Sequence, residues 1–196
     1  MIGAVVLAAG RSGRMGPQKL LLPLHGQPII TGIVDELLRS PLERIVVVVG
    51  RNTAQIQNAL AGRVDTFAQN PDPAGDMLSS VRCGLRVLPA ACEAVLVVLG
   101  DQPGITQGLV AGLVRAFRET RRGIIVPAQA GRRGHPLLFA AHFCDEILTR
   151  YDGIGLHGLL AAHPAEILEH AVPSAMALDD VDTPEDYARL VKSTPV

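Results

Sequence analysis

The residues best suited to chemistry lie between positions 7 and 19, directly after an apolar run. Arg14 offers a planar fork to phosphate oxygens, and Lys19 offers a mobile point charge. The glycines of this segment allow the positive φ angles that turn successive N–H groups inward around an anion. They are Gly10, Gly13 and Gly16. The segment predicts a triphosphate site, and the alternative is a solvated turn between a strand and a helix.

Several familiar sites are excluded by residue spacing. A Walker A loop requires Gly-Lys-Ser/Thr, but Lys19 follows Gln18 and precedes Leu20. A dinucleotide fingerprint requires GxGxxG, whereas the glycines here stand three residues apart. The histidines form no HExxH pair and no serine stands in a GxSxG elbow. The sequence therefore indicates neither a zinc-hydrolase site nor a serine-hydrolase triad.

A second feature is an aspartate that follows another apolar run. Asp101 lies in Leu99-Gly-Asp-Gln-Pro103, which ends the run 95–99. Ligands of open α/β sheets bind at the carboxyl ends of the strands, so we expect Asp101 at the same edge as the glycine segment. A carboxylate there can hold Mg²⁺, which prefers one or two carboxylates together with phosphate oxygens. The alternative is an aspartate that only ends a strand in a turn.

A third feature is the stretch 178–186, which carries five acidic residues. Asp182 is the candidate metal ligand, because it stands immediately before the helix-capping Thr183 and can point into a cleft. Glu185 and Asp186 are better explained by the helix N-terminus, where negative charge is favourable. The alternative is that all of these acids only cap the helix and solvate a turn.

The elements that must position these residues form an alternating pattern of short β-branched runs and helical segments. This pattern predicts an α/β fold with a single doubly wound, mostly parallel sheet and helices on both faces. The expected strands are 2–7, 45–49, 95–99 and 124–126, with 64–68, 137–139 and 177–181 as outer strands. Helices are expected from Pro28, over 54–60 between Thr53 and Gly62, over 107–118 after Thr106, and after Thr183. No repeat or linker divides the chain, so we expect one domain over 1–196.

The composition is that of a globular protein with a large aliphatic core. The chain of 196 residues is 48% hydrophobic and 19% charged, and its net charge is −1. That balance gives no reason to expect a nucleic-acid or membrane partner. Three cysteines without a CxxC pair fit reduced thiols, and no signal peptide or membrane-length apolar run is present. We expect a soluble, cytoplasmic protein.

Taken together, the motifs resemble the MobA-like nucleotidyltransferases, and most of all their molybdenum cofactor cytidylyltransferase branch. The resemblance spans nearly the whole chain, in the family's order: LAAGRSGRMGPQKLLLP at 7–23, NPDPAGDMLSSVRCGL at 70–85, LGDQP at 99–103, GHP at 134–136 and DVDTPEDY at 180–187. It implies a Rossmann-like nucleotidyltransferase fold. It also implies Mg²⁺-dependent transfer of CMP from CTP to the phosphate of a molybdopterin-type molybdenum cofactor, with release of pyrophosphate.

The resemblance also assigns roles to residues. Arg14, Lys19 and Asp101 would be catalytic, the two cations by neutralising the triphosphate and the leaving pyrophosphate. Asp101 and Asp182 would hold Mg²⁺. The residues implied for the nucleotide are Leu7, Ala8, Ala9, Gly10, Ser12, Gly13, Arg14, Met15, Gly16, Lys19, Gly75, Ser79, Ser80, Gly100 and Asp101. Those implied for the acceptor are Gln102, Pro103, Gly134, His135 and Pro136, where His135 is alternatively only a turn histidine.

Base and acceptor are less strongly specified. Guanylyl-transferring relatives typically carry Leu-Ala-Gly-Gly, whereas this chain has Leu-Ala-Ala-Gly, so the resemblance favours CTP over GTP through Ala9. Where relatives often carry Gly-Asp-x-Gly-Ala-Arg, this chain has Asp152-Gly-Ile-Gly-Leu-His157. This departure leaves the acceptor open.

Three alternatives remain. The first keeps the fold but uses GTP or a different phosphorylated acceptor, such as a sugar phosphate or methylerythritol phosphate. The second is an NADPH-dependent reductase on the same fold, against which the missing GxGxxG counts. The third is a non-catalytic carrier that delivers the molybdenum cofactor. For the resembled activity, the implied client is a xanthine dehydrogenase-type molybdenum hydroxylase.

Overall fold

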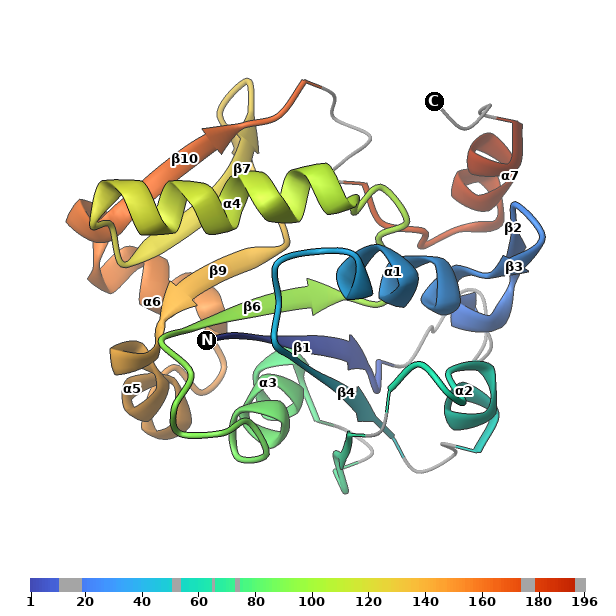
Figure 1. Ribbon diagram of the computed structural model, residues 1–196, viewed down its shortest axis with the longest axis horizontal. Coiled ribbons are helices and arrows are strands. Elements are labelled where there is room, and N and C mark those ends of the chain that lie inside the picture. The colour runs from blue at the N-terminus through green and yellow to red at the C-terminus, as the bar shows by residue number, and fades with distance from the viewer. Residues whose placement is uncertain (11–18, 51–53, 65, 73–74, 174–178, 193–196) are drawn as a thin grey trace.

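The computed structural model describes residues 1–10, 19–50, 54–64, 66–72, 75–173 and 179–192. Through them runs a mostly parallel sheet in the order β10-β7-β9-β6-β1-β4-β5, and β8 pairs with β7 outside this path (Figure 1). The strands are β1 Ile2–Ala8, β4 Arg44–Val49, β5 Phe67–Gln69, β6 Ala94–Leu99, β7 Ile124–Gln129, β8 Arg132–Arg133, β9 Leu137–Ala140 and β10 Ile167–Ala171. A small antiparallel pair joins β2 Pro23–Leu24 to β3 Gln27–Pro28.

The centre of the sheet is β1, which pairs in parallel with β4 on one side and with β6 on the other. Val5 lies opposite Val46 and Val97 in these pairs, and all three side chains are buried. Parallel neighbours require crossovers that place helices over both faces, so the strands carry continuous apolar runs. The exceptions are β9, which runs antiparallel to both β6 and β7, and the short β8, which runs antiparallel to β7.

Helices cover the two faces of the sheet in separate groups. They are α1 Ile29–Leu38, α2 Ala54–Ala59, α3 Met77–Leu85, α4 Gln107–Thr120, α5 Cys144–Thr149, α6 Leu156–Ala162 and α7 Pro184–Lys192, with short 3₁₀ turns η1 Lys19–Leu21, η2 Ala141–Phe143 and η3 Pro164–Glu166. Val6 of β1 packs into one core with α1, α2 and α4. Its neighbour Val5 packs into a second core with α3, α5 and α6. Successive strand residues thus serve opposite faces.

The predicted fold class, a doubly wound and mostly parallel α/β sheet, is confirmed by this architecture. Two predicted helix starts are confirmed as well. Thr106 caps α4 by accepting the N–H of Leu109 over 3.2 Å. Thr183 and Asp186 form a reciprocal box at the start of α7, with bonds of 2.9 and 3.1 Å. Within the described residues no helix is both long and apolar enough to cross a membrane.

Several expected outer elements differ from the structure. Of the strand predicted over 177–181, positions 177 and 178 lie outside the described residues, and Asp179–Val181 is not a strand. The outer strand is instead β10, whose half-exposed Glu169 and His170 mask its apolar signal. The strand predicted over 64–68 begins only at Phe67. Pro28 precedes α1 instead of starting it.

Candidate functional site

Lys19 lies between two carboxylates that come from distant parts of the chain. Its Nζ is 2.6 Å from Asp101 Oδ2 and 3.0 Å from Asp182 Oδ1, and its side chain is only 12% exposed. Burial alone would lower the pKa of Lys19, but the hydrogen bonds and charges of the two aspartates outweigh it and raise that pKa. The two aspartates thus favour the charged form of Lys19.

The position of Asp101 follows from the pairing of β1 with β6. Because these strands are parallel neighbours, their carboxyl ends meet at one edge, where Ala8 ends β1 and Asp101 follows β6. Gly100 donates its N–H to the carbonyl of Leu7 over 3.0 Å. A Cβ at Gly100 would lie 2.7 Å from that same oxygen, so only glycine fits here. This close approach sets where the chain turns and where Asp101 is presented.

The segment before α7 crosses the same edge and brings Asp182 to it. Val181 donates its N–H to the carbonyl of Asp101 over 3.0 Å, and Gln102 Nε2 donates to Asp180 Oδ1 over 3.3 Å. These bonds explain why 179–181 is not a strand, since its polar groups are bonded to the turn that follows β6. Burial raises the pKa of Asp180, and the nearby charges of Asp101 and Asp182 raise it further. The carboxylates of Asp101, Asp180 and Asp182 therefore lie close enough to influence one another electrostatically.

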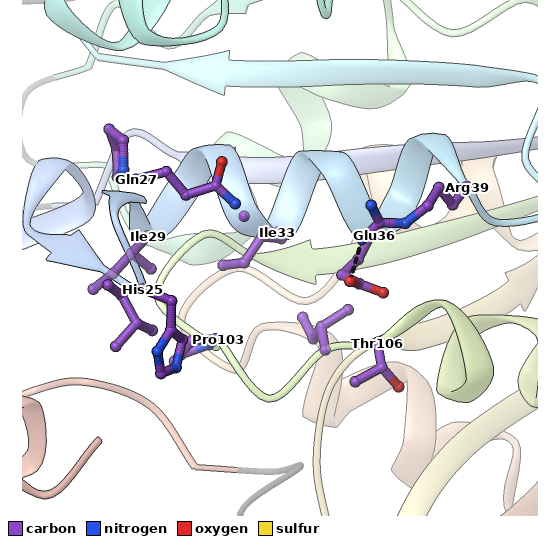
Figure 2. Close-up of a pocket in the computed structure, with 12 residues that line it drawn as sticks. His25, Gln27, Ile29, Ile33, Glu36, Arg39, Pro103 and Thr106 are labelled. Atoms are coloured by element: carbon purple, nitrogen blue, oxygen red, sulfur yellow. Dashed lines mark hydrogen bonds and ion pairs between the residues drawn. The ribbon is translucent and has the colours of Figure 1, made fainter. Parts of the chain in front are cut away.

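The turn after β6 is also held from the side of α1. A small hollow of about 180 Å³ lies between α1 and this turn. Figure 2 shows that Ile33 and Glu36 of α1 face Pro103 and Thr106 across it. Glu36 accepts the backbone N–H of Gln107 over 2.7 Å. This bond ties the start of α4 to α1, and so fixes both ends of the turn that carries Asp101.

The glycine segment is only partly described. Ser12, Gly13, Arg14, Met15 and Gly16 lie outside the described residues, so their predicted roles stay predictions. Leu7, Ala8 and Ala9 are half-buried at the end of β1, beside Gly100 and Gly50. Glycine allows a positive φ at Gly10, but its φ lies outside that range in this structure. Gly10 is exposed instead, and among the described residues no atom lies within 4 Å of where its Cβ would be.

The start of α3 forms a second polar corner of the site. Asn70 follows β5 and donates through Nδ2 to Ser79 Oγ at 2.8 Å and to Ser80 Oγ at 2.9 Å. Asp76 caps the helix by accepting the N–H of Ser79 over 2.8 Å. A Cβ at Gly75 would lie 2.4 Å from Ser79 Oγ, so this turn also requires glycine. The structure thus joins the predicted Gly75, Ser79 and Ser80 into one hydrogen-bonded unit.

A cavity of about 490 Å³ opens between this corner and the ends of β6, β7 and β9. Apolar side chains of β6, β7, β9 and α6 line it, while Gln102, Arg132, Arg133, His135, His157 and Asp180 supply polar groups. Its volume and mixed lining are typical of a small-molecule site. Of the predicted acceptor residues, Gln102, Gly134 and His135 line the cavity. Pro103 faces the hollow beside α1 instead, and Pro136 is buried outside the lining.

His135 is the most perturbed titratable group of this cavity. Burial, assisted by the neighbouring His157 and opposed by the charge of Asp101, lowers the pKa of His135 from 6.5 to about 4. Its buried Nε2 has no hydrogen-bond partner among the described residues. An unsatisfied buried ring nitrogen in a cavity wall is placed to bond a bound molecule. His135 is therefore neutral at physiological pH.

Sequence reasoning missed several residues of the site. Asn70 organises the two serines, Asp180 bonds Gln102, and Arg132 pairs with Asp179 at 2.9 Å beside the cavity. Asn70 had a detectable signal, since it follows a strand and opens the Asn-Pro-Asp-Pro turn. Asp180 and Arg132 had none, because their partners are distant in sequence.

The two predicted metal ligands fit a hard divalent cation. Asp101 Oδ2 and Asp182 Oδ1 converge on one point, at which Lys19 Nζ supplies a positive charge. Carboxylate oxygens are the protein ligands that Mg²⁺ prefers. Among the described residues, no group of three or more His, Cys, Asp and Glu side chains has the arrangement of a metal site. A cation here would therefore draw its remaining ligands from a bound phosphate or water.

Comparison with known proteins agrees with this geometry. Residues 4–167 match the model of the MobA-like NTP transferase domain. Among curated proteins, the molybdenum cofactor cytidylyltransferase of Escherichia coli K12 is 27% identical over 188 residues, covering 95% of this chain and 93% of that protein. The bifunctional protein GlmU of Burkholderia lata is 34% identical over 152 residues, covering 76% of this chain. The match spans only 33% of that longer protein.

Solved structures with the same fold are also found. Rv0371c of Mycobacterium tuberculosis superimposes with a TM-score of 0.86 at 26% identity, covering 99% of this chain and 100% of that one. A second structure of Rv0371c, in complex with manganese, has a TM-score of 0.80 at 24% identity and covers 98% and 99% of the two chains.

Proposed function

Since the chain belongs to the MobA-like NTP transferase family, we propose that it transfers CMP from CTP to the phosphate of a molybdopterin-type molybdenum cofactor. An acceptor phosphate oxygen attacks the α-phosphorus of CTP, the bond to the β-phosphate breaks, and pyrophosphate leaves. The observation that carries the proposal is the convergence of Lys19, Asp101 and Asp182 at the ends of β1 and β6. Likeness to the E. coli cytidylyltransferase over 95% of the chain supports the choice of substrates.

Asp101 and Asp182 would hold the divalent cation, proposed to be Mg²⁺. Bound there, the cation would neutralise phosphate charge and orient the transferred group. The manganese complex of Rv0371c, a protein of the same fold, supports a divalent ion as cofactor. Lys19, already desolvated and charged, would stabilise negative charge on the leaving pyrophosphate, together with Arg14. No side-chain base is needed, because the acceptor phosphate is itself a nucleophile.

The nucleotide would lie along the edge between β1 and α3. Ala8, Ala9 and Gly10 leave room for the backbone to approach it, and the Asn70-bonded Ser79 and Ser80 would contact base and ribose. Ala9 carries the proposed preference for CTP, since its methyl group fills space that glycine leaves open. The preference concerns one small side chain, so we expect a selectivity of about tenfold to a hundredfold.

The cavity of about 490 Å³ would take the acceptor. Its apolar walls suit a flat ring system, and Arg132 and Arg133 at its mouth suit an anionic substituent. Neutral His135 would hydrogen-bond the ring through the free Nε2. The proposed client that receives the product is a xanthine dehydrogenase-type molybdenum hydroxylase.

Pyrophosphate release tests the proposal. Purified protein is incubated with Mg²⁺, molybdenum-loaded molybdopterin and one of CTP, GTP, ATP or UTP, and release is followed over time. We expect release with CTP above all others, and none without acceptor. Release with GTP alone would keep the transfer chemistry and overturn the role of Ala9. Silence with every nucleotide would leave another phosphorylated acceptor, such as a sugar phosphate.

One variant and one assay distinguish the proposed transferase from a non-catalytic carrier and from a reductase. A non-catalytic carrier would bind molybdopterin as tightly in Asp101→Asn as in the wild type and show no turnover in either. A reductase would consume NADPH in the presence of a quinone-like dye. The carboxylate pair on Lys19 favours phosphoryl chemistry over both, since neither carrier nor reductase requires a cation site.

A further inference from the structure

We propose that Arg82 is a positioning residue that fixes the acceptor side of the large cavity relative to the helix bearing Ser79 and Ser80. The inference rests on the proposed function for the identity of the two ligands. Its structural part, the coupling of two cavity walls, rests on the contacts of Arg82 alone. Arg82 is not among the residues that line the cavity.

Arg82 uses its whole guanidinium on one neighbouring segment. Nε donates to the carbonyl of Ile147 at 2.8 Å, Nη2 to the carbonyl of Arg150 at 2.6 Å, and Nη1 to Asp152 Oδ1 at 2.5 Å. The side chain is only 15% exposed. The two carbonyls lie at the end of α5, where a helix leaves its last acceptors unsatisfied. A planar five-donor group is the side chain that can satisfy such a divergent set at once.

The segment that Arg82 holds leads directly into the cavity wall. After α5 the chain passes through left-handed residues, with φ of +74° at Tyr151, +73° at Gly153 and +71° at Gly155. The carbonyl of Tyr151 accepts the N–H groups of Ile154 and Gly155 at 3.1 and 2.9 Å. Residues 153–157 then line the cavity opposite the start of α3. A non-glycine residue such as Tyr151 keeps a positive φ only where its surroundings impose it.

Arg82 thereby connects the two walls. It lies on α3, one turn after the serines proposed for the nucleotide, and it fixes the turn that presents His157. Helices α3 and α5 lie side by side on the same face of the sheet (Figure 1). The width of the cavity between Met77 and Ile154 depends on this connection. Both of these apolar side chains are exposed, so they lie at the open side of the cavity.

The test compares Arg82→Lys with Arg86→Lys. Lysine keeps the positive charge but cannot reach three divergent acceptors, whereas Arg86 is an exposed residue at the end of the same helix. In Arg82→Lys we expect the KM for the acceptor to rise about tenfold, with kcat and the KM for CTP within about twofold of wild type. Hydrogen exchange at the amides of Ile154 and Gly155 should accelerate about tenfold. Arg86→Lys should match the wild type in each measurement.

A milder variant keeps the test decisive if Arg82→Lys folds poorly. Asp152→Asn removes only the contact to an 80% exposed carboxylate and leaves both carbonyl contacts in place. We expect local exchange to accelerate less than in Arg82→Lys, in the same two amides. Unchanged exchange at these amides in both variants would overturn the proposal. A parallel rise of both KM values, with faster exchange throughout α3, would also overturn it and leave Arg82 a merely structural role.

The exchange measurement separates this proposal from the proposed function. If the wild type transfers nothing to molybdopterin, the substrates are wrong. Accelerated exchange confined to 154–155 would still establish that Arg82 holds this wall. Conversely, active transfer with equal acceptor KM in wild type and Arg82→Lys would keep the function and reject the positioning role.

Discussion

Val181 donates its backbone N–H to the carbonyl of Asp101 across 3.0 Å, joining the last part of the chain to the turn after a central strand. This bond involves no side chain, so it is available to any residue except proline at 181. It brings Asp182 beside Asp101, although nearly half of the chain separates them. A hydrogen bond between backbone groups thus brings together the two carboxylates of the proposed metal site.

The first prediction concerns Asp101. Changing Asp101→Asn leaves an amide beside Lys19 and removes one of two carboxylates proposed for the cation. We expect kcat for transfer to fall at least about a hundredfold. The matched control is Asp35→Asn on α1. This change removes an ion pair outside the site, in which Asp35 Oδ1 lies 2.7 Å from Arg63 Nε. Turnover of Asp101→Asn within a few-fold of the control would refute the metal assignment.

The second prediction concerns Gly100. Gly100→Ala would place a methyl group 2.7 Å from the carbonyl oxygen of Leu7, so the end of β6 must move away from β1. We expect a loss of about 1 to 3 kcal/mol in the free energy of unfolding, measured by urea titration. Gly108→Ala is the control, because it lies on exposed α4 with only Thr106 Oγ1 nearby, at 3.9 Å. That change should stabilise by about 0.5 to 1 kcal/mol.

The third prediction is a pH dependence carried by His135. Its pKa is about 4 in the folded protein and 6.5 ordinarily, so the unfolded chain binds more protons between these values. Stability is therefore fully present above about pH 6.5 and falls as the pH drops towards 4, by on the order of 3 kcal/mol. The free energies of unfolding of wild type and His135→Gln, measured by urea titration, should therefore approach each other as the pH falls. Parallel curves across this window would contradict the prediction.

The fourth prediction addresses base selectivity. Ala9→Gly restores the space that guanylyl-transferring relatives keep, so we expect the ratio of kcat/KM for CTP over GTP to fall about tenfold. The neighbouring Ala8→Gly serves as the control, since it removes the same methyl group one residue earlier. An equal effect of both variants would mean that backbone freedom is responsible, and not the space beside the base.

The central fold was predictable because its signals are local. The runs 2–7, 45–49 and 95–99 are continuous and apolar, and buried parallel strands leave that pattern in any sequence. The capping box at Thr183 is equally local. By contrast, β10 carries exposed polar residues, which hide its strand pattern. The conformation of 179–181 depends on hydrogen bonds to Asp101 and Gln102, which are distant in sequence. That residues 1–196 form a single domain stays a prediction.

The candidate site divides in the same way. Lys19, Asp101 and Asp182 were predicted from separate motifs, and the structure places Lys19 Nζ within 3.0 Å of a carboxylate oxygen of each aspartate. The partners of Arg82 could not be inferred, since two of the three are backbone carbonyls that any sequence possesses. The resemblance implied that both Gln102 and Pro103 contact the acceptor, yet the turn directs the two towards different hollows.

The reversed direction of β9 has a consequence for how this fold can diversify. Its first residue, Leu137, pairs with Val97 near the end of β6, so the strand contributes its beginning to the edge where its neighbours contribute their ends. The connection 129–136, with its β8 hairpin, therefore reaches the cavity proposed for the acceptor without passing the corner proposed for the nucleotide. Insertions or exchanges in this stretch can change which molecule is accepted while the sheet and the triphosphate segment keep their sequence. Evolution can thus alter the acceptor independently of the nucleotide donor.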